Sequence, residues 1–290
     1  MSFTFPAADG TQIVVYRWDP AGEPIAAVQI THGMGEHAQR YEHVASALTD
    51  AGYVVYAQDQ RGHGASIVGS AGDLGTGSWP GLVDDIGRLS AVVRAEHPGI
   101  PLILLGHSMG SFAVQQYLLD HSADIDAVVL TGTAVIDPLE SALDLDAPLD
   151  LTLFNAAFQP ARTDFDWLSR DEAVVDAYVA DPLCGFGIDS TSAKAMFVGA
   201  RRLADPSQVV ALRYSLPVYI AVGELDPVNG GLALLHPLTE RLKDAGLTDV
   251  TVVIYPGARH EILNETNSAE VITALIAWLD RVAAAAAPQR

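Results

Sequence analysis

A Gly-x-Ser-x-Gly motif at Gly106-His107-Ser108-Met109-Gly110 constrains this chain more than any other feature of its sequence. The apolar run Pro101–Leu105 before it is typical of a buried parallel strand, and Ser111–His121 after it has the apolar spacing of a partly buried helix. A strand-to-helix turn this sharp admits only small residues two positions before and after the serine. The motif therefore predicts a serine hydroxyl at the top of a sheet, beside a helix N-terminus that favours negative charge. Because both flanks fit, we prefer this interpretation to a glycine-rich turn with an incidental serine.

Strands and helices alternate over most of the 290 residues. A hairpin is predicted from Ser2–Phe5 to Thr11–Trp18. The strands predicted after it are Ala26–Thr31, Tyr53–Gln58, Pro101–Leu105, Ala127–Thr131, Pro217–Val222 and Val250–Tyr255. Further helices are predicted at Tyr41–Ala51, Leu82–His97, Pro237–Ala245 and Ser268–Ala286. This order predicts an α/β fold with a mostly parallel twisted sheet and helices on both of its faces.

The segment 137–212 breaks this alternation, because it contains no clear core strand and is rich in aromatic residues. Short amphipathic helices are predicted in it at 151–154, 165–168 and 196–198. We expect the segment to be a helical cap, inserted between the core parts 1–136 and 213–290. Such a cap would lie over the carboxyl ends of the strands, where ligands bind in open α/β sheets.

Composition narrows the class of protein further. The net charge of −20 and the isoelectric point near 4.5 argue against a nucleic-acid partner, because phosphate contacts need lysine and arginine. Neither of the two lysines, Lys194 and Lys243, follows a glycine, so no phosphate-binding Gly-Lys-Ser/Thr loop occurs. The single cysteine, Cys184, fits a reducing compartment and is expected to be a packing thiol. No secretory signal and no membrane-spanning apolar run is visible, so a cytoplasmic location is expected.

A serine hydroxyl is a weak nucleophile until a base takes its proton, and that base must be held in the correct tautomer. With this type of turn the expected chain order is serine, acid, histidine. Asp226 follows one predicted strand, and His260 lies in the loop after the last predicted strand. The sequence therefore predicts a catalytic triad of Ser108, Asp226 and His260. Asp137 is a rival for the acid, and Glu224 is a weaker one.

The oxyanion that forms in acyl transfer needs hydrogen-bond donors aimed at it. One predicted donor is the backbone N–H of Met109, directly after the serine. The second should come from the loop after Ala26–Thr31, where the Met34 N–H is the preferred candidate. The alternative is that His32–Gly35 is simply a glycine-rich turn.

The sequence resembles the monoacylglycerol lipase and lysophospholipase-like family of α/β-hydrolases, also called serine aminopeptidase-like hydrolases. The resemblance rests on motifs at His32–His37 with Arg40-Tyr41, Asp59–Ser66, Gly106–Gly110, Gly223–Asp226 and His260–Glu265. It implies the α/β-hydrolase fold, the same triad and the same oxyanion donors. It also implies that Glu36 and Arg40 lie near the site, bracing loops more than contacting substrate.

Two positions depart from the family pattern. Ser111 replaces a second glycine that often follows the serine motif, and Leu263 stands where some glyceride-cleaving members carry a second histidine. The second departure weakens the case for recognition of a glycerol head group. The expected activity is that of a serine carboxylester hydrolase with an acyl-enzyme intermediate, acting on monoacylglycerols, lysophospholipids or other apolar esters. Phe154 and Phe158 are expected either to contact substrate or to anchor the cap, whose transient contact with a membrane surface is left open.

Other classes of function fit parts of the sequence. A cofactor-free haloperoxidase or a thioesterase could use the same triad, whereas an epoxide hydrolase would need aspartate at position 108. Gly33–Ala38 fits a dinucleotide-binding fingerprint, with Asp59 near the position of a ribose-binding acid, but that interpretation leaves the triad without a role. A non-catalytic binding protein on the same fold is the remaining alternative.

No cofactor and no metal site are expected from the sequence. The histidines nearest one another, His32, His37 and His43, are spaced by five and six residues. No His-Glu-x-x-His motif is present. The spacing of the histidines along the chain therefore gives no reason to expect a metal site.

Overall fold

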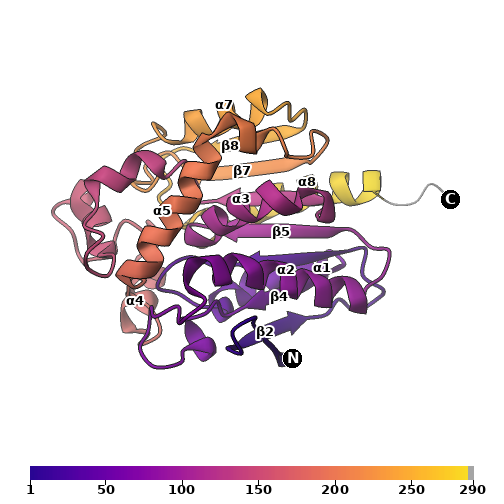
Figure 1. Cartoon of the computed structure of the whole chain (residues 1–290), viewed down its shortest axis with the longest axis horizontal. Coiled ribbons are helices and arrows are strands. Elements are labelled where there is room, and N and C mark those ends of the chain that lie inside the picture. Colours follow the sequence, from indigo (N-terminus) through magenta and orange to yellow (C-terminus); the bar gives the residue numbers. More distant parts are fainter. Residues whose placement is uncertain (287–290) are drawn as a thin grey trace.

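The computed structural model describes residues 1–286, which form one eight-stranded sheet with helices on both faces (Figure 1). The strands are β1 (Ser2–Pro6), β2 (Gln12–Trp18), β3 (Ala26–Thr31), β4 (Tyr53–Gln58), β5 (Leu102–His107), β6 (Ala127–Thr131), β7 (Val218–Gly223) and β8 (Val250–Tyr255). Their spatial order is β1-β2-β4-β3-β5-β6-β7-β8. β1, β2 and β4 pair antiparallel, and all pairs from β4 to β8 are parallel. The predicted fold class is confirmed.

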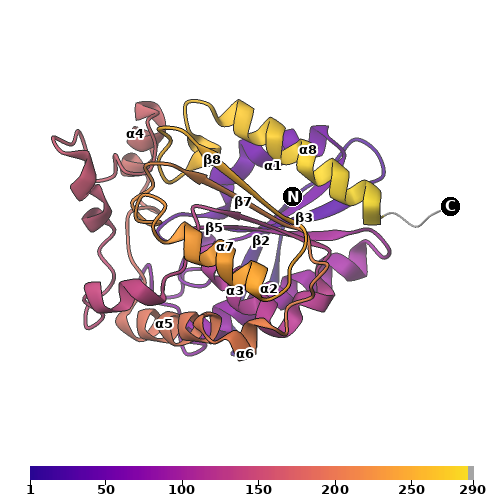
Figure 2. The same cartoon turned by 90° about the horizontal axis from the view of Figure 1, so that it is seen from above.

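The parallel strands are apolar at consecutive positions because both faces of the sheet are covered. In β4, Val54 and Tyr56 belong to one hydrophobic core, whereas Val55 and Ala57 belong to the other. Figure 2 shows α1 and α8 on one face, and α2 and α3 on the opposite face. The helices of the main body are α1 (Glu42–Asp50), α2 (Ser78–Glu96), α3 (Met109–His121), α7 (Leu235–Asp244) and α8 (Ser268–Ala286), with short 3₁₀ helices η1 (Ala38–Tyr41), η2 (Gly64–Ser66), η3 (Ser122–Asp124) and η6 (Ile262–Asn264).

The predicted elements of the main body are all present. β3, β4, β6, β8 and α8 have the predicted bounds, and the others differ by one to four residues at their ends. The largest difference is at α2, which begins at Ser78 rather than Leu82. Within residues 1–286, no helix has the length and apolar character needed to cross a bilayer.

The segment between β6 and β7 projects past one end of the sheet, at the left of Figures 1 and 2. We call residues 137–212 the insertion. It contains η4 (Asp137–Ala142), η5 (Leu151–Phe158), α4 (Glu172–Ala180), α5 (Ser190–Ala204) and α6 (Pro206–Val209). α5 lies against α2 and α3, where Gln116 Nε2 donates to the Met196 carbonyl at 3.2 Å. One side of the insertion is therefore fixed to the main body.

The helix predicted at 165–168 is wrong, because this stretch forms a turn. The Asp166 carboxylate accepts hydrogen bonds from the Thr163 N–H at 3.2 Å and from the Thr163 hydroxyl at 2.7 Å. The Asn155 side chain accepts from the Trp167 N–H at 3.0 Å. Side chains of this kind satisfy backbone groups locally and so compete with helix formation. The helix predicted at 196–198 is the middle of the much longer α5.

Candidate active site

Ser108 lies at the turn between β5 and α3 with φ 51° and ψ −124°. A residue with a side chain rarely adopts this strained conformation, which here is fixed by a 2.9 Å hydrogen bond from the Ser108 N–H to the Thr131 carbonyl. A Cβ at Gly106 would lie 2.7 Å from Ser111 Cα, and one at Gly110 would lie 2.0 Å from a β3 carbonyl oxygen. The motif glycines are therefore required by space, as the sequence predicts.

His260 and Asp226 come from the loops after β8 and β7, and their Nδ1 and Oδ1 atoms are 2.9 Å apart. Asp226 is fully buried and His260 is 2% exposed. The rings of His107 and Trp167 flank the imidazole, each with its centroid 4.9 Å away. Burial by itself would lower the pKa of His260, but the carboxylates of Asp226 and, to a lesser degree, Glu261 and Glu36 together outweigh it and raise that pKa. An Nδ1–H donated to Asp226 leaves Nε2 able to accept a proton.

Ser108 and His260 line one cavity together with Met34 and Met109. The space between its lining residues is about 730 Å³, part of which is open to solvent. The apolar side chains around it come from both the main body and the insertion: Phe112, Ile136, Leu139, Leu143, Leu149, Leu151, Phe154, Trp167, Leu168, Met196, Phe197 and Val228. Met109 is the first residue of α3, where no preceding helical turn supplies an acceptor for its N–H. The arrangement can hold an apolar ligand against a serine, an imidazole and backbone donors.

A second buried ionic group lies beside this cavity and consists of Glu36, Arg40 and Glu261. Arg40 donates to Glu36 at 2.6 Å and forms two parallel bonds of 2.7 Å to Glu261. Glu36 also accepts the Gly33 N–H at 2.6 Å. The Arg40 guanidinium lies over the Tyr178 ring of α4, 4.8 Å from its centroid. Arg40 therefore joins the loop after β3, the loop that carries His260, and the insertion.

Glu36 and Arg40 strengthen each other's charge. Burial would raise the pKa of Glu36, but Arg40, and to a lesser degree His107 and His32, lower it to about 2. Likewise the two carboxylates outweigh burial and raise the pKa of Arg40. Sequence reasoning places Glu36 and Arg40 near the site but assigns no role to Glu261. The only local signal for Glu261 is that it directly follows His260.

The rival acids have other partners. Asp137 forms two hydrogen bonds with Arg241, of 2.7 and 2.9 Å. Glu224 is exposed and accepts the Gly257 N–H at 2.9 Å. Within residues 1–286, the carboxylate that hydrogen-bonds the ring of His260 is Asp226.

The two phenylalanines singled out in the insertion differ in position. Phe154 lines the cavity, with its ring centroid 5.0 Å from that of Trp167. Phe158 lies under the guanidinium of Arg259, 4.5 Å away, and is not among the lining residues. Phe154 is therefore placed to contact a ligand, and Phe158 to anchor the insertion.

The insertion packs closely against the glycine motif after β3. A Cβ at Gly35 would lie 2.4 Å from the Phe186 carbonyl oxygen of the insertion. Asp59 accepts hydrogen bonds from the N–H groups of Ala38 at 2.8 Å and Ala65 at 2.7 Å, so its carboxylate is engaged in holding loops. These contacts argue against the dinucleotide hypothesis.

Comparison with known proteins identifies the family. The model of the family described as serine aminopeptidase, S33, matches residues 22–267. The chain belongs to this family of α/β-hydrolases. It is 31% identical to a monoacylglycerol lipase of Mycolicibacterium smegmatis, covering 95% of each chain. It is 30% identical to the monoglyceride lipase of Homo sapiens, covering 89% of this chain and 82% of that one.

A solved structure supports the same assignment. The thermostable carboxyl esterase from Bacillus coagulans, solved in complex with glycerol, superposes with a TM-score of 0.86 at 25% identity, covering 98% of each chain. The predicted family resemblance is therefore confirmed, and the protein is a serine hydrolase.

Proposed function

We propose that this serine hydrolase is a carboxylester hydrolase that forms an acyl-enzyme at Ser108. The observation that carries the proposal is the apolar cavity in which Ser108 lies with the hydrogen-bonded His260–Asp226 pair. The family relationship supports ester hydrolysis as the reaction class.

In the proposed mechanism, His260 Nε2 takes the proton of Ser108 while Oγ attacks the ester carbonyl carbon. Asp226 keeps Nδ1 protonated and stabilises the imidazolium that forms. The N–H groups of Met34 and Met109 donate to the developing oxyanion. His260 then protonates the leaving alkoxide, and the acyl group stays on Ser108. A water molecule, deprotonated by His260, attacks this acyl group and releases the acid.

We further propose that the insertion acts as a cap and that the acyl chain lies among its apolar side chains. Leu143, Leu149, Leu151 and Phe154 supply one wall of the cavity. Each buried methylene contributes about 0.8 kcal/mol, so such a wall favours acyl chains longer than acetyl. The relatives named monoacylglycerol lipase support a monoacyl lipid ester as the substrate class.

Replacement of the serine tests the reaction. Ser108→Ala should lower ester turnover by about a million-fold, as loss of the nucleophile does in other serine hydrolases. A fluorophosphonate should label the wild-type protein and Ser46→Ala, which changes an exposed serine of α1, but not Ser108→Ala. Equal labelling of Ser108→Ala would place the nucleophile elsewhere.

A substrate panel tests the acyl preference separately. Esters of increasing acyl length, monoacylglycerols and lysophospholipids are compared at equal concentration. If acetate esters are cleaved faster than longer esters, the lipid assignment is wrong, although the serine esterase assignment stands.

A further inference from the structure

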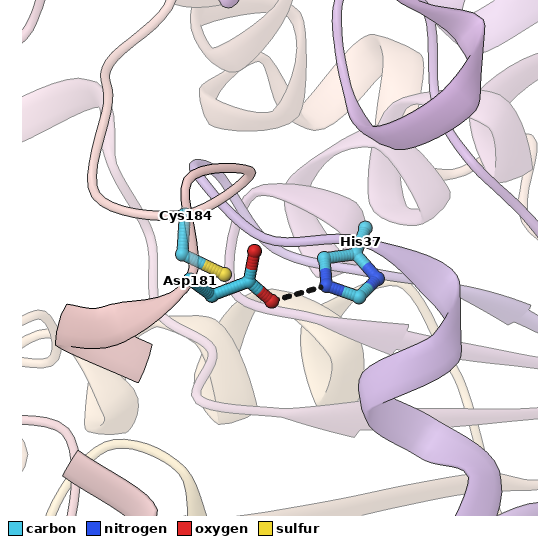
Figure 3. Close-up of side chains that lie close together, drawn as sticks. All are labelled: His37, Asp181 and Cys184. Atoms are coloured by element: carbon cyan, nitrogen blue, oxygen red, sulfur yellow. Dashed lines mark hydrogen bonds and ion pairs between the residues drawn. The ribbon is translucent and has the colours of Figure 1, made fainter. Parts of the chain in front are cut away.

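His37, Asp181 and Cys184 form a cluster of possible metal ligands outside the cavity of Ser108 (Figure 3). His37 follows the loop after β3, whereas Asp181 and Cys184 follow α4 in the insertion. His37 Nε2 lies 2.9 Å from Asp181 Oδ2, and the ligand atoms of all three residues lie within 4.8 Å of one another. In Figure 3 the Cys184 sulfur and the Asp181 carboxylate lie on the same side of the His37 ring.

We propose that His37 Nε2, the Asp181 carboxylate and Cys184 Sγ bind one Zn²⁺ ion, with water as the fourth ligand. Imidazole, carboxylate and thiolate are the three ligand types that zinc uses, and the thiolate disfavours Mg²⁺ and Ca²⁺. Tetrahedral bond lengths of zinc place ligand atoms about 3 to 4 Å apart. The ligand atoms of the cluster lie within 4.8 Å of one another, so the proposal requires them to move closer when the ion binds.

Burial and access both suit an ion at this place. His37 is 8% exposed, and Cys184 is partly exposed. The Asp181 side chain is 30% exposed, which leaves a path for the ion to enter. The buried imidazole of His37 would hold the ion in a fixed position. The exposed side at Asp181 would let a water molecule bind as the fourth ligand.

The charges around the cluster favour a dication. Asp181, Glu36 and Glu261 supply three carboxylates, against one guanidinium from Arg40. The local field is therefore negative, which raises the concentration of cations at the site. Binding of the ion forms the S–Zn bond, and the proton of the Cys184 thiol is released to solvent.

A bound ion would join two parts of the chain that already touch. The Gly185 N–H donates to the Gly35 carbonyl at 3.0 Å, next to the His37–Asp181 bond. Gly35 is adjacent to Met34, whose N–H is a proposed oxyanion donor. Zinc at this place would therefore fasten the insertion to the loop beside the catalytic serine.

The test uses full-length, untagged protein stripped of metals with EDTA. Zinc is titrated in competition with a chromophoric chelator, and Co²⁺ is added separately as a spectroscopic probe. One equivalent of Zn²⁺ should bind, Zn²⁺ should raise the thermal unfolding midpoint, and Co²⁺ should give a thiolate charge-transfer band in the near ultraviolet. If the wild-type protein with Co²⁺ does not show that band, the proposal is wrong, whatever the variants show.

Variants then assign the ligands. Cys184→Ser and His37→Gln should each weaken Zn²⁺ binding at least about tenfold, and Cys184→Ser should abolish the Co²⁺ band. The matched control is His121→Gln, which removes a surface histidine whose Nδ1 lies 3.5 Å from Asp124 with no thiol nearby. It should bind Zn²⁺ like the wild type. Unchanged binding in both cluster variants, with their circular dichroism unaltered, would show that the ion binds elsewhere.

Discussion

Two buried ionic groups lie beside the same cavity, and they differ in what their charges can do. The pair His260–Asp226 contains a base whose pKa is raised mainly by its partner and also by Glu261 and Glu36, and this base can gain and lose a proton. The group Glu36–Arg40–Glu261 contains an arginine that stays charged and a glutamate with a pKa of about 2. The first arrangement suits proton transfer, and the second suits fixing loops. Burial of charge alone therefore does not identify a catalytic group.

The largest effect expected from this comparison is at Asp226. Asp226→Asn should lower kcat by about 10⁴-fold, because the amide favours the wrong tautomer of His260 while leaving the geometry intact. Asp137→Asn is the matched control, since Asp137 is paired with Arg241 instead. Steady-state kinetics on one ester would decide between them. A severe loss in Asp137→Asn with a mild loss in Asp226→Asn would reverse the assignment of the acid.

The second group should show its effect in stability. Arg40→Met leaves two buried carboxylates without their partner, so the free energy of unfolding should fall by about 3–5 kcal/mol. Arg88→Met breaks an exposed pair with Asp84 and should cost less than about 1 kcal/mol. Urea unfolding of both variants measures the difference. Equal, small losses would mean that the Arg40 group does not brace the loops.

Local sequence predicts the parts of this molecule whose structure is decided locally. β4 is an unbroken apolar run that ends in a polar loop, so its bounds follow from the pattern. The serine motif is equally local, because Gly106 and Gly110 meet the backbone of their own turn and of the neighbouring strand. Both can therefore be predicted without considering how the insertion folds.

The remaining features depend on how the insertion folds back on the main body. Arg40 and Glu261 are 221 positions apart, and His37 and Asp181 are 144 apart, so no spacing rule brings them together. The apolar spacing at 165–168 predicts a helix, but hydrogen bonds to the side chains of Asn155 and Asp166 fix this stretch as a turn. The local sequence pattern therefore cannot predict which distant polar groups pair.

The pH dependence separates the two ionic groups again. A neutral His260 is required as base, so kcat/KM should fall about tenfold per pH unit below a pKa that lies above 6.5. The raised pKa means that folded His260 binds its proton more tightly than unfolded His260. Its contribution to stability is therefore complete below about pH 6.5 and is lost as pH rises through the folded pKa.

Glu36 should affect stability only at acidic pH. Because the pKa of Glu36 is lowered to about 2, its contribution to stability is present above about pH 4.5 and is lost as pH falls toward 2. Between pH 5 and 9, kcat/KM and the free energy of unfolding should therefore respond to the titration of His260 but not to that of Glu36. A flat rate profile over this range, with the protein folded, would argue against histidine as the base.

The smallest expected effect concerns the wall of the cavity. Phe154 lines the cavity beside Trp167, so Phe154→Ala should remove apolar contact with an acyl chain. One buried methylene is worth about 0.8 kcal/mol, or about fourfold in kcat/KM, so the ratio between longer and acetyl esters should fall several-fold. Phe158→Ala removes a ring that packs on Arg259 away from the lining, and it should leave this ratio unchanged. If both variants lower the ratio equally, the phenylalanines act by anchoring the insertion. If neither does, the acyl chain does not lie against Phe154.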